Sequence, residues 1–483
     1  MLFNSIDFAV FLPIVFAIYW LIPNSRIRLQ NAVLLIASYV FYGWWDWRFL
    51  SLIIISSLID YVVGLAMHRE QVQLKRKLLL LISLCANLGL LGYFKYFNFF
   101  AESFVAAFTF FNVSFDVSRL NIILPVGISF YTFQTLSYSI DIYRRKLEPT
   151  QRIVDFFAFV SFFPQLVAGP IERASNLLPQ FNRQRHFSYE LAVDGLRQIL
   201  WGLFKKIVIA DNCAVLVNLV FADHTAYSGS TLLLAAVLFA FQIYGDFSGY
   251  SDIATGTARL FGFNLMQNFA FPYFSRDIAE FWRRWHISLS SWFRDYLYIP
   301  LGGSRGTQWK TVRNIFVIFL VSGFWHGANW TFLFWGFLHA LYFLPLQLAS
   351  KNRQNLEPID RNKVLPGFWD ILNMGKTFFL VVAAWIFFRA DSISTAFDYI
   401  VRICSLSLFS MPEIGVTKLI PLIAILIVVE WINRHEAHGF KRIGFPTLPM
   451  FNNRIFRWST YHAIILLIIL LGSEPQTFIY FQF

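Results

Sequence analysis

The chain is built from apolar segments that recur from Ile6 to Leu471 with no long polar stretch between them. Charged residues make up 14% of its 483 positions, whereas a soluble domain carries roughly 25%. These charges are too few to cover a soluble surface, so we expect a membrane protein. The length alone suggests about three soluble domains, but the unbroken apolar pattern favours one membrane domain over residues 1–483.

Most of the apolar segments have the length of a membrane span, which is about 20 residues with roughly 17 as the lower limit. The clearest candidates are 6–22, 49–67, 78–100, 122–143, 230–245, 328–350, 374–388, 416–433 and 458–472. Polar residues, Gly or Pro interrupt the stretches 31–45, 153–169 and 195–221. We predict an all-α polytopic protein with about ten to twelve transmembrane helices, some of them tilted or broken.

Basic residues gather after alternate spans, and loops rich in Lys and Arg face the cytoplasm. These clusters comprise Arg26 and Arg28, then residues 69–77, 144–152, 351–363 and 434–457. The loops 44–48 and 101–121 are poor in Lys and Arg. The pattern places the N-terminus and the ending FIYFQF outside. It also explains the net charge of +12 without a nucleic-acid partner, because the charges do not form one stripe.

Several familiar chemical signals are absent. There is no Walker phosphate loop, HExxH pair or dinucleotide fingerprint, and Cys85, Cys213 and Cys404 lack a paired spacing. Gly302, Ser304 and Gly306 match the spacing of a nucleophile elbow, but that motif needs a strand before it and a helix after it. We predict a flexible turn there, no metal site and no bound cofactor.

The region 160–330 mixes membrane-grade apolar residues with many polar and charged ones. Such segments persist at membrane depth only where they are buried in protein or line a water-filled cavity. We therefore expect the functional site here, in a catalytic core that covers about residues 120–345.

His326 is the sharpest candidate in this region, within the motif SGFWHGANW between two apolar runs. Thirteen residues separate it from Arg313, and at about 1.5 Å per residue this places His326 roughly 20 Å into the membrane. Gly323 and Gly327 have the GxxxG spacing that lets helices pack closely, and Asn329 adds a polar group. The alternative is a packing motif with a buried neutral His, but an ionisable group at this depth is a functional candidate by default.

His286 lies in FWRRWHISLSSWFRDYLYIP, which is an amphipathic interfacial helix or a second part of the same cavity. The motif GDFSGYSD holds Asp246 and Asp252, for which a structural hydrogen-bonding role is favoured over a role as cavity ligands. His339 falls inside an expected helix and is interpreted as structural.

The buried imidazole has no Ser or Cys nucleophile, metal cluster or phosphate-binding loop beside it. It could therefore act as a base that removes the proton of an alcohol as the alcohol attacks an activated acyl group. Imidazole, with an unperturbed pKa near 6.5, accepts a proton at neutral pH, and a positioned base contributes about 10² to 10⁴-fold. Backbone N–H groups at a broken helix would stabilise the oxyanion. The residues alone also allow a second functional class, a proton-coupled transporter. Transporters often consist of two similar halves with matching broken spans, and this sequence shows no such repeat.

At these motifs the sequence resembles the membrane-bound O-acyltransferase family, and most closely its bacterial alginate O-acetyltransferase-like branch. The resemblance runs over nearly the whole chain, in MLFNSIDFAVFLPIVFAIYW, ILPVGISFYTFQTLSYSIDIYR (123–144), FFPQLVAGPIER (162–173), QIYGDFSGYSDIA (242–254), FWRRWHISLSSWFRDYLYIPLGG (281–303), SGFWHGANWTFLFWG (322–336) and FIYFQF.

The resemblance implies helices around a central funnel, with His326 as the essential histidine and His286 as its partner. Six further residues are expected to line the substrate channel or support it: Asp295, Arg294, Trp325, Asn329, Asp246 and Ser248. The expected donor is acetyl-CoA or another acyl thioester on the cytoplasmic side.

The family resemblance also implies a bacterial inner-membrane location with both termini in the periplasm. The expected partners are membrane lipid, a polysaccharide acceptor and a periplasmic acetyltransferase of the serine esterase type. The leading hypothesis is O-acetylation of an exopolysaccharide such as alginate. Acetylation of peptidoglycan, or D-alanyl transfer to another envelope glycan, is the alternative with related chemistry.

Overall fold

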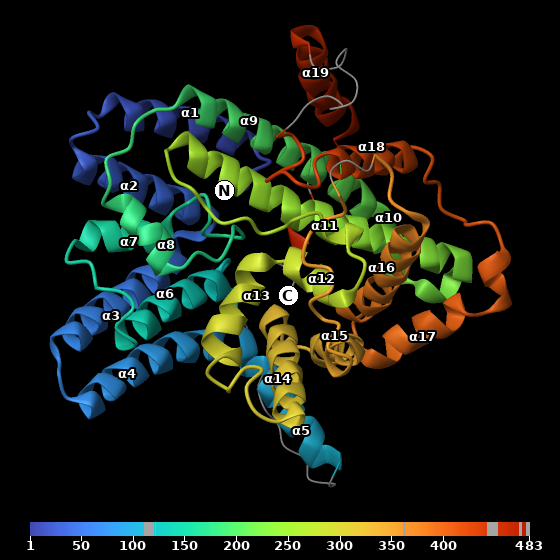
Figure 1. Ribbon diagram of the computed structural model, residues 1–483, viewed down its shortest axis with the longest axis horizontal. Helices are drawn as coiled ribbons and strands as arrows, with labels where there is room; N and C mark the ends of the chain where they lie inside the picture. The colour runs from blue at the N-terminus through green and yellow to red at the C-terminus, as the bar shows by residue number, and fades with distance from the viewer. Residues whose placement is uncertain (111–119, 121, 361–363, 442–452, 473–475, 480–483) are drawn as a thin grey trace. The chain divides into compact units, whose positions relative to one another are not determined.

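The computed structural model describes residues 1–110, 120, 122–360, 364–441, 453–472 and 476–479. Every regular element in these ranges is a helix (Figure 1), which confirms the predicted all-α class. The chain divides into two compact units, residues 1–191 with 258–265 and residues 192–257 with 266–483. The description of 1–483 as one membrane domain remains a prediction.

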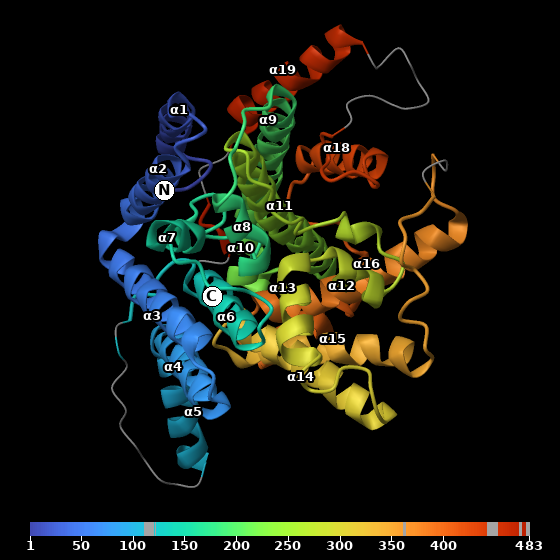
Figure 2. The ribbon, with the colours of Figure 1, turned by 60° about the vertical axis from the view of Figure 1, so that its left-hand side comes forward.

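The first unit contains the N-terminal helices. They are α1 (Ile6–Leu21), α2 (Ile27–Asp46), α3 (Leu50–Arg69), α4 (Gln73–Leu91), α5 (Phe97–Phe110), α6 (Ile128–Tyr143), α7 (Ile153–Ser161) and α8 (Ala174–Phe181). Helix α3 packs against α4 and α6 (Figure 2). The buried carboxylate of Asp60 on α3 joins these helices, because it accepts hydrogen bonds from Asn87 Nδ2 at 2.8 Å and from Ser139 Oγ at 3.1 Å.

The second unit begins within α9 and contains the candidate histidines. Its helices are α9 (Tyr189–Leu203), α10 (Asp211–Ala222), α11 (Gly229–Leu260), α12 (Ile278–Arg284), α13 (Ile287–Phe293), α14 (Gln308–His326), α15 (Trp330–Leu348), α16 (Phe368–Arg389), α17 (Ile393–Ile403), α18 (Leu419–Ile432) and α19 (Arg454–Leu471). Two π-helical turns, η3 (Phe204–Ala210) and η6 (Arg294–Tyr298), interrupt the regular helices. The last turn of α11 belongs to the first unit.

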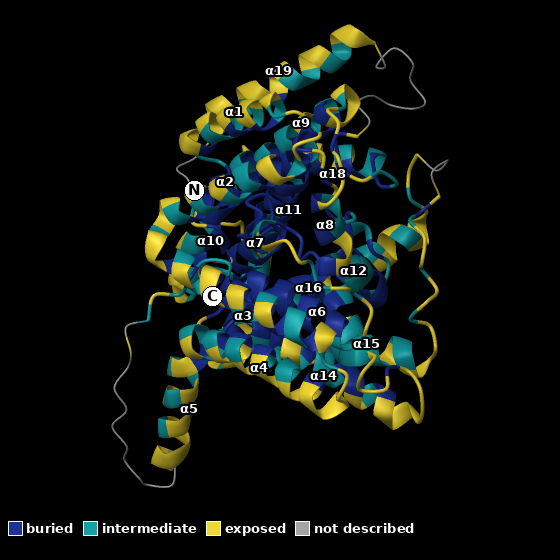
Figure 3. Ribbon diagram, turned by 90° about the vertical axis from the view of Figure 1, so that its left-hand side faces the viewer, coloured by how far each residue is buried: buried dark blue, intermediate teal, exposed yellow. Residues whose placement is uncertain are grey.

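Six helical segments among the described residues are long and apolar enough to cross a membrane. They are 27–69, 73–109, 229–260, 330–348, 368–389 and 454–471, with shorter apolar helices at Ile6–Leu21 and Leu419–Ile432. Within the second unit, α11 is mostly buried, whereas α19 buries only Ile464 (Figure 3). Ile469 and Leu470 of α19 are 69% and 74% exposed. Such apolar faces suit lipid rather than water.

Of the three predicted spans with polar interruptions, one lies within a single helix and two are divided. Residues 31–45 lie in α2, 153–169 contain the short helix α7, and 195–221 fall across α9, η3 and α10. The predicted span 122–143 is shorter as a helix, because α6 begins at Ile128 after Gly127, which adopts a φ of 75°. Parts of the topology prediction, namely Arg361, Lys363, Arg442 and the last four residues of FIYFQF, lie outside the described residues.

Helices α14 and α15 form a close hairpin that carries His326. A Cβ at Gly323 would meet the backbone carbonyl of Phe332, and a Cβ at Gly336 would meet that of Phe319. A Cβ at Gly327 would meet the ring of Phe332. The predicted glycine packing motif therefore lets the backbones of the two helices come into close contact.

Candidate active site

His326 is the last residue of α14, where the helix ends at an extended Gly327. The chain starts α15 at Trp330, and Asn329 caps it by accepting a hydrogen bond from Thr331 N at 3.0 Å. The helix is therefore broken directly after the histidine. The side chain of His326 is buried, with 3% of the residue exposed.

His286 occupies a second helix break, between α12 and α13. Its φ of 45° is left-handed, which is uncommon for a residue with a Cβ. Only 1% of the residue is exposed. The alternative of one amphipathic interfacial helix over 281–300 is wrong, because this stretch forms two short helices and a π-turn around a buried histidine.

The two imidazoles lie in one site, with ring centroids 6.4 Å apart. Trp325 lies beside both, at centroid distances of 5.8 Å from His286 and 5.0 Å from His326. Trp335 and Phe388 approach His326 edge-on at 5.1 and 5.3 Å. Phe247 of α11 approaches His286 at 4.6 Å. Aromatic rings therefore wall the site and exclude water, which strengthens electrostatic interactions inside it.

Asn268 is a site residue that the sequence did not reveal. It lies in the segment between α11 and α12, and its Oδ1 is 3.1 Å from His286 Nδ1. The same oxygen accepts hydrogen bonds from the backbone N and the Oγ of Ser288, at 3.3 and 2.8 Å. No motif marks this residue in the sequence, because only the fold brings it to a histidine 18 positions away.

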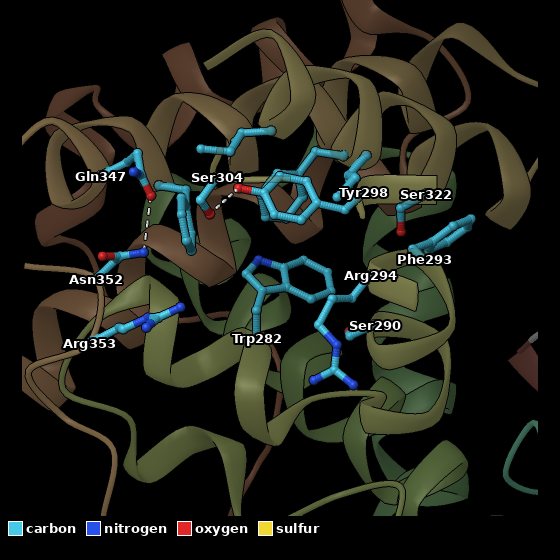
Figure 4. A pocket seen from close by; sticks show the side chains of 14 residues that line it. Trp282, Ser290, Phe293, Arg294, Tyr298, Ser304, Ser322, Gln347, Asn352 and Arg353 are labelled. Atoms are coloured by element: carbon cyan, nitrogen blue, oxygen red, sulfur yellow. Dashed lines mark hydrogen bonds between the residues drawn. The ribbon is translucent and has the colours of Figure 1, made fainter. Parts of the chain in front are cut away.

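A pocket of about 240 Å³ lies against the helices that carry the two histidines (Figure 4). It is lined by α12, α13, η6, α14, α15 and the segment after α15. Ser322 of this pocket lies one helical turn before His326, and Ser290 donates its backbone N–H to His286 O at 3.0 Å. Arg294 and Arg353 also line the pocket. The two guanidinium groups suit a ligand with an anionic part.

The residues predicted to line or support the substrate channel lie in several parts of the second unit. Arg294 Nε donates to Asp295 Oδ1 at 2.8 Å, and the Arg294 side chain is 61% exposed. Arg294 reaches the pocket, and Trp325 lies beside both histidines. Asn329 caps α15 and also donates to the backbone carbonyl of Asp391 at 3.1 Å, so its side chain holds the helix break in shape.

Asp246 and Ser248 belong to a buried lysine cluster. Asp246 Oδ1 lies 2.7 Å from Lys206 Nζ, and Lys205 Nζ donates to Ser248 Oγ at 2.9 Å. Lys206 is also 2.8 Å from Asp211, and Lys205 is 2.6 Å from Asp252. The sequence analysis missed both lysines, although two charges within the apolar run LFKKIVIA were a visible signal.

His339 lies inside α15, as predicted, and takes a hydrogen bond at Nδ1 from Trp282 Nε1 at 3.3 Å. Its ring packs 4.9 Å from that of Trp335. Gly302, Gly303 and Gly306 adopt positive φ angles in the loop before α14, in agreement with the predicted turn. Among the described residues, no group of three or more His, Cys, Asp and Glu side chains is placed to hold a metal ion.

Two comparisons with known proteins bear on this site. Residues 39–388 match the model of the membrane-bound O-acyltransferase family. The probable alginate O-acetylase AlgI of Azotobacter vinelandii is 40% identical over 425 residues, which cover 87% of this chain and 82% of the relative.

Relatives with other acceptors are also similar. The peptidoglycan O-acetyltransferase of Helicobacter pylori is 36% identical, over 82% of this chain and 78% of its own length. The teichoic acid D-alanyltransferase of Bacillus subtilis is 30% identical, over 46% of this chain and 58% of its own length. Both histidine motifs fall within the matched residues 39–388. The chain belongs to the membrane-bound O-acyltransferase family and is an O-acyltransferase.

Proposed function

We propose that the enzyme moves acetyl groups from a thioester donor on the inner side of the membrane to O-acetylate an outer polysaccharide such as alginate. The observation that carries the proposal is the placement of His326 and His286 at two buried helix breaks, with ring centroids 6.4 Å apart. An imidazole pair in an aromatic, water-poor site is suited to proton transfer during acyl transfer.

The chemistry needs one proton transfer for each acyl group. The acceptor hydroxyl oxygen attacks the thioester carbonyl carbon, a C–O bond forms, and the C–S bond breaks. His326 takes the hydroxyl proton, and the departing thiolate receives a proton in return, with His286 as the second proton-transfer group. With the hydroxyl outside and the thiolate inside, one proton moves inward for each acetyl group that moves outward.

The donor is acetyl-CoA or another acyl thioester, and the pocket beside α14 is its proposed entrance. Arg294 and Arg353 at this pocket suit the phosphate groups of such a donor. Arg353 belongs to the basic cluster 351–363, which the positive-inside rule assigns to the cytoplasm. Ser290 and Ser322 also line this pocket, on α13, which follows His286, and on α14, which ends at His326.

The proposed location is the bacterial inner membrane, with both termini in the periplasm. Helix α16 follows the basic cluster 351–363 in the sequence, and one membrane crossing by this helix would put the segment after it on the outer side. That segment pairs with the turn before α11, since His224 Nε2 is 2.8 Å from Asp398 Oδ2 and Ser228 Oγ donates to Glu413 at 2.7 Å. These contacts support one common outer face in the second unit.

The proposed partners are membrane lipid, the polysaccharide acceptor and a periplasmic acetyltransferase of the serine esterase type. Acetylation of alginate is favoured over that of peptidoglycan because the relative named for alginate has the higher identity, 40% against 36%. D-alanyl transfer is supported by a relative that covers only 46% of this chain.

Replacement of His326 by Ala tests the function. We expect the O-acetyl content of the cell's glycans to fall by about 10² to 10⁴-fold at unchanged protein abundance, because a positioned base is lost. The matched control is His462→Ala, which changes an exposed histidine on α19 that contacts its own helix at Trp458 O.

The same experiment identifies the acceptor. Loss of acetyl esters from a secreted polysaccharide supports the proposal, whereas loss from peptidoglycan moves the acceptor to the cell wall. Loss of D-alanyl esters alone would overturn the acetyl assignment. Normal esters on every glycan in the His326→Ala strain would overturn the catalytic role of this site.

A further inference from the structure

Asn268 makes several polar contacts close to His286. The residue is 2% exposed. Its Nδ2 donates to Ser251 Oγ on α11 at 3.1 Å, and its backbone carbonyl accepts from Ile287 N at 2.9 Å. Its Oδ1 faces Ser288 and His286. One amide thus links α11, the segment before α12 and the start of α13.

The orientation of this amide is fixed by chemistry. The backbone N–H of Ser288 can only donate, and it points at the Asn268 side-chain atom 3.3 Å away. A flipped amide would place its NH₂ group against this donor and would lose the Ser288 bond. The atom that faces both Ser288 and His286 is therefore the oxygen.

The orientation of the amide decides the tautomer of His286. An amide oxygen accepts and does not donate, so His286 Nδ1, 3.1 Å from it, must carry a hydrogen. In the neutral ring the other nitrogen, Nε2, then holds the lone pair. His286 consequently presents Nε2 as its proton-accepting atom.

The backbone at His286 is held by the same segment. The left-handed φ of 45° is unfavourable for a histidine, so the surrounding structure must hold it. The Asn268 carbonyl binds the N–H of the next residue, Ile287, and the His286 carbonyl accepts from Ser290 N. These bonds fix the direction of the imidazole as well as its tautomer.

We propose that Asn268 is a positioning residue for acyl transfer, because it holds His286 in the tautomer whose Nε2 accepts a proton. This inference rests on the proposed function, in which His286 is the second proton-transfer group. Asn268 acts through His286 and need not touch the substrate.

A neutral amide at this position keeps His286 able to release its proton again. The ring neighbours of His286 include Phe247, Phe269, Trp325 and the titratable His326. The nearby carboxylates of α11 are bound elsewhere, since Asp246 pairs with Lys206 and Asp252 pairs with Lys205. A carboxylate in place of the Asn268 amide would stabilise the protonated imidazole and slow its return to the neutral form.

Two substitutions separate this role from a merely structural one. Asn268→Ala removes the acceptor, so we expect acetyl transfer to fall by at least about tenfold. Asn268→Asp keeps an oxygen for Ser288 and His286 but adds a negative charge. For Asn268→Asp we expect the acidic limb of the pH–activity profile to move to higher pH by about one unit.

The measurements are initial rates of acetyl transfer from pH 5 to 9 in membranes that contain equal amounts of each variant. Asn218→Asp is the matched control, because it makes the same change in a half-buried amide that contacts Arg389. The control is expected to keep the native profile. A profile of Asn268→Asp that is unshifted, or full activity of Asn268→Ala, overturns the inference.

The remaining outcomes are also decisive. Loss of both Asn268 variants from the membrane would show that the residue serves folding, and the proposal would fall. If His326→Ala abolishes transfer while both Asn268 variants behave as the native enzyme, only the role of Asn268 is wrong. If His326→Ala is itself active, the proposed function fails first.

Discussion

The second unit contains two groups of buried polar side chains that are built in opposite ways. Lys205 faces one carboxylate at 2.6 Å, and Lys206 faces two, at 2.7 and 2.8 Å. Around His286 and His326 the neighbours are mainly Trp and Phe rings, and the Nδ1 of His286 lies 3.1 Å from the side-chain oxygen of a neutral amide, Asn268. Both groups are almost fully buried.

The difference separates a structural role from a chemical one. Opposite charges that are paired inside a protein hold the helices that carry them, and removal of one partner leaves an uncompensated charge. An imidazole among aromatic rings can gain or lose a proton without the loss of a helix contact. We therefore expect the lysine cluster to govern the amount of folded protein, and the histidine pair to govern the rate per molecule.

The largest effect on stability is expected for Lys206→Met. Lys206 contacts Asp211, Asp246 and the backbone carbonyl of Gln476, at 2.8, 2.7 and 3.2 Å. The substitution leaves two carboxylates without their cation, which costs about 3–5 kcal/mol for a broken buried pair. Thermal unfolding in detergent and abundance in the membrane measure the loss.

Asp246→Asn is the matched variant in the same cluster. It leaves Lys206 with one carboxylate, Asp211, and the amide oxygen can still accept the bond that Ile479 N makes to Asp246 at 2.8 Å. We expect a smaller loss of stability than for Lys206→Met, with the rate per folded molecule retained. If Asp246→Asn were as abundant as the native protein but inactive, Asp246 would have a role in the reaction. The assignment of a purely structural role to the lysine cluster would then be wrong.

An intermediate effect is expected for His339→Leu. This change removes the acceptor of the Trp282 N–H, which lies 3.3 Å away, and a buried donor without a partner costs about 1–3 kcal/mol. His339→Gln, which offers an oxygen in the same region, should restore part of the stability. If His339→Leu were stable but inactive, His339 would join the proton-transfer groups.

Sequence reasoning was most successful where one residue carries the signal. A histidine inside the apolar run around His326 is costly in a membrane, so its position alone marked it. The glycines beside it predicted a close helix pair, and α14 and α15 form one. The helical class followed from hydropathy, because lipid requires backbone groups to be bonded within the segment.

The parts that were missed depend on contacts between distant residues. Asn268 stands in an irregular segment, and nothing in its neighbourhood points to His286. The helix break at His286 requires a left-handed backbone at a residue other than glycine, which hydropathy does not report. Arg294 and Asp295 were predicted to line or support the channel, and the sequence did not indicate the ion pair between them.

The smallest effect is expected at a polar contact outside the spans, in the segment between η7 (Leu406–Phe409) and α18. Glu413 accepts hydrogen bonds from Thr231 Oγ1 and, at 2.7 Å, from Ser228 Oγ. These bonds, that from Thr231 first, hold the pKa of Glu413 below its ordinary value of 4.5. A carboxylate with a lowered pKa stabilises the folded state at pH values above its ordinary pKa.

This contribution is lost as the pH falls below about 4.5 and through the lower pKa of the folded protein. We expect protease cleavage within residues 404–418 to increase between pH 6 and pH 3.5, and Glu413→Gln, which keeps the shape without the charge, to remove most of that pH dependence. Since the side chain meets water, the overall unfolding temperature should change little. A large drop in that temperature in Glu413→Gln would show that a charged group outside the spans also governs stability. The lysine cluster would then not be the main charged group that stabilises the second unit.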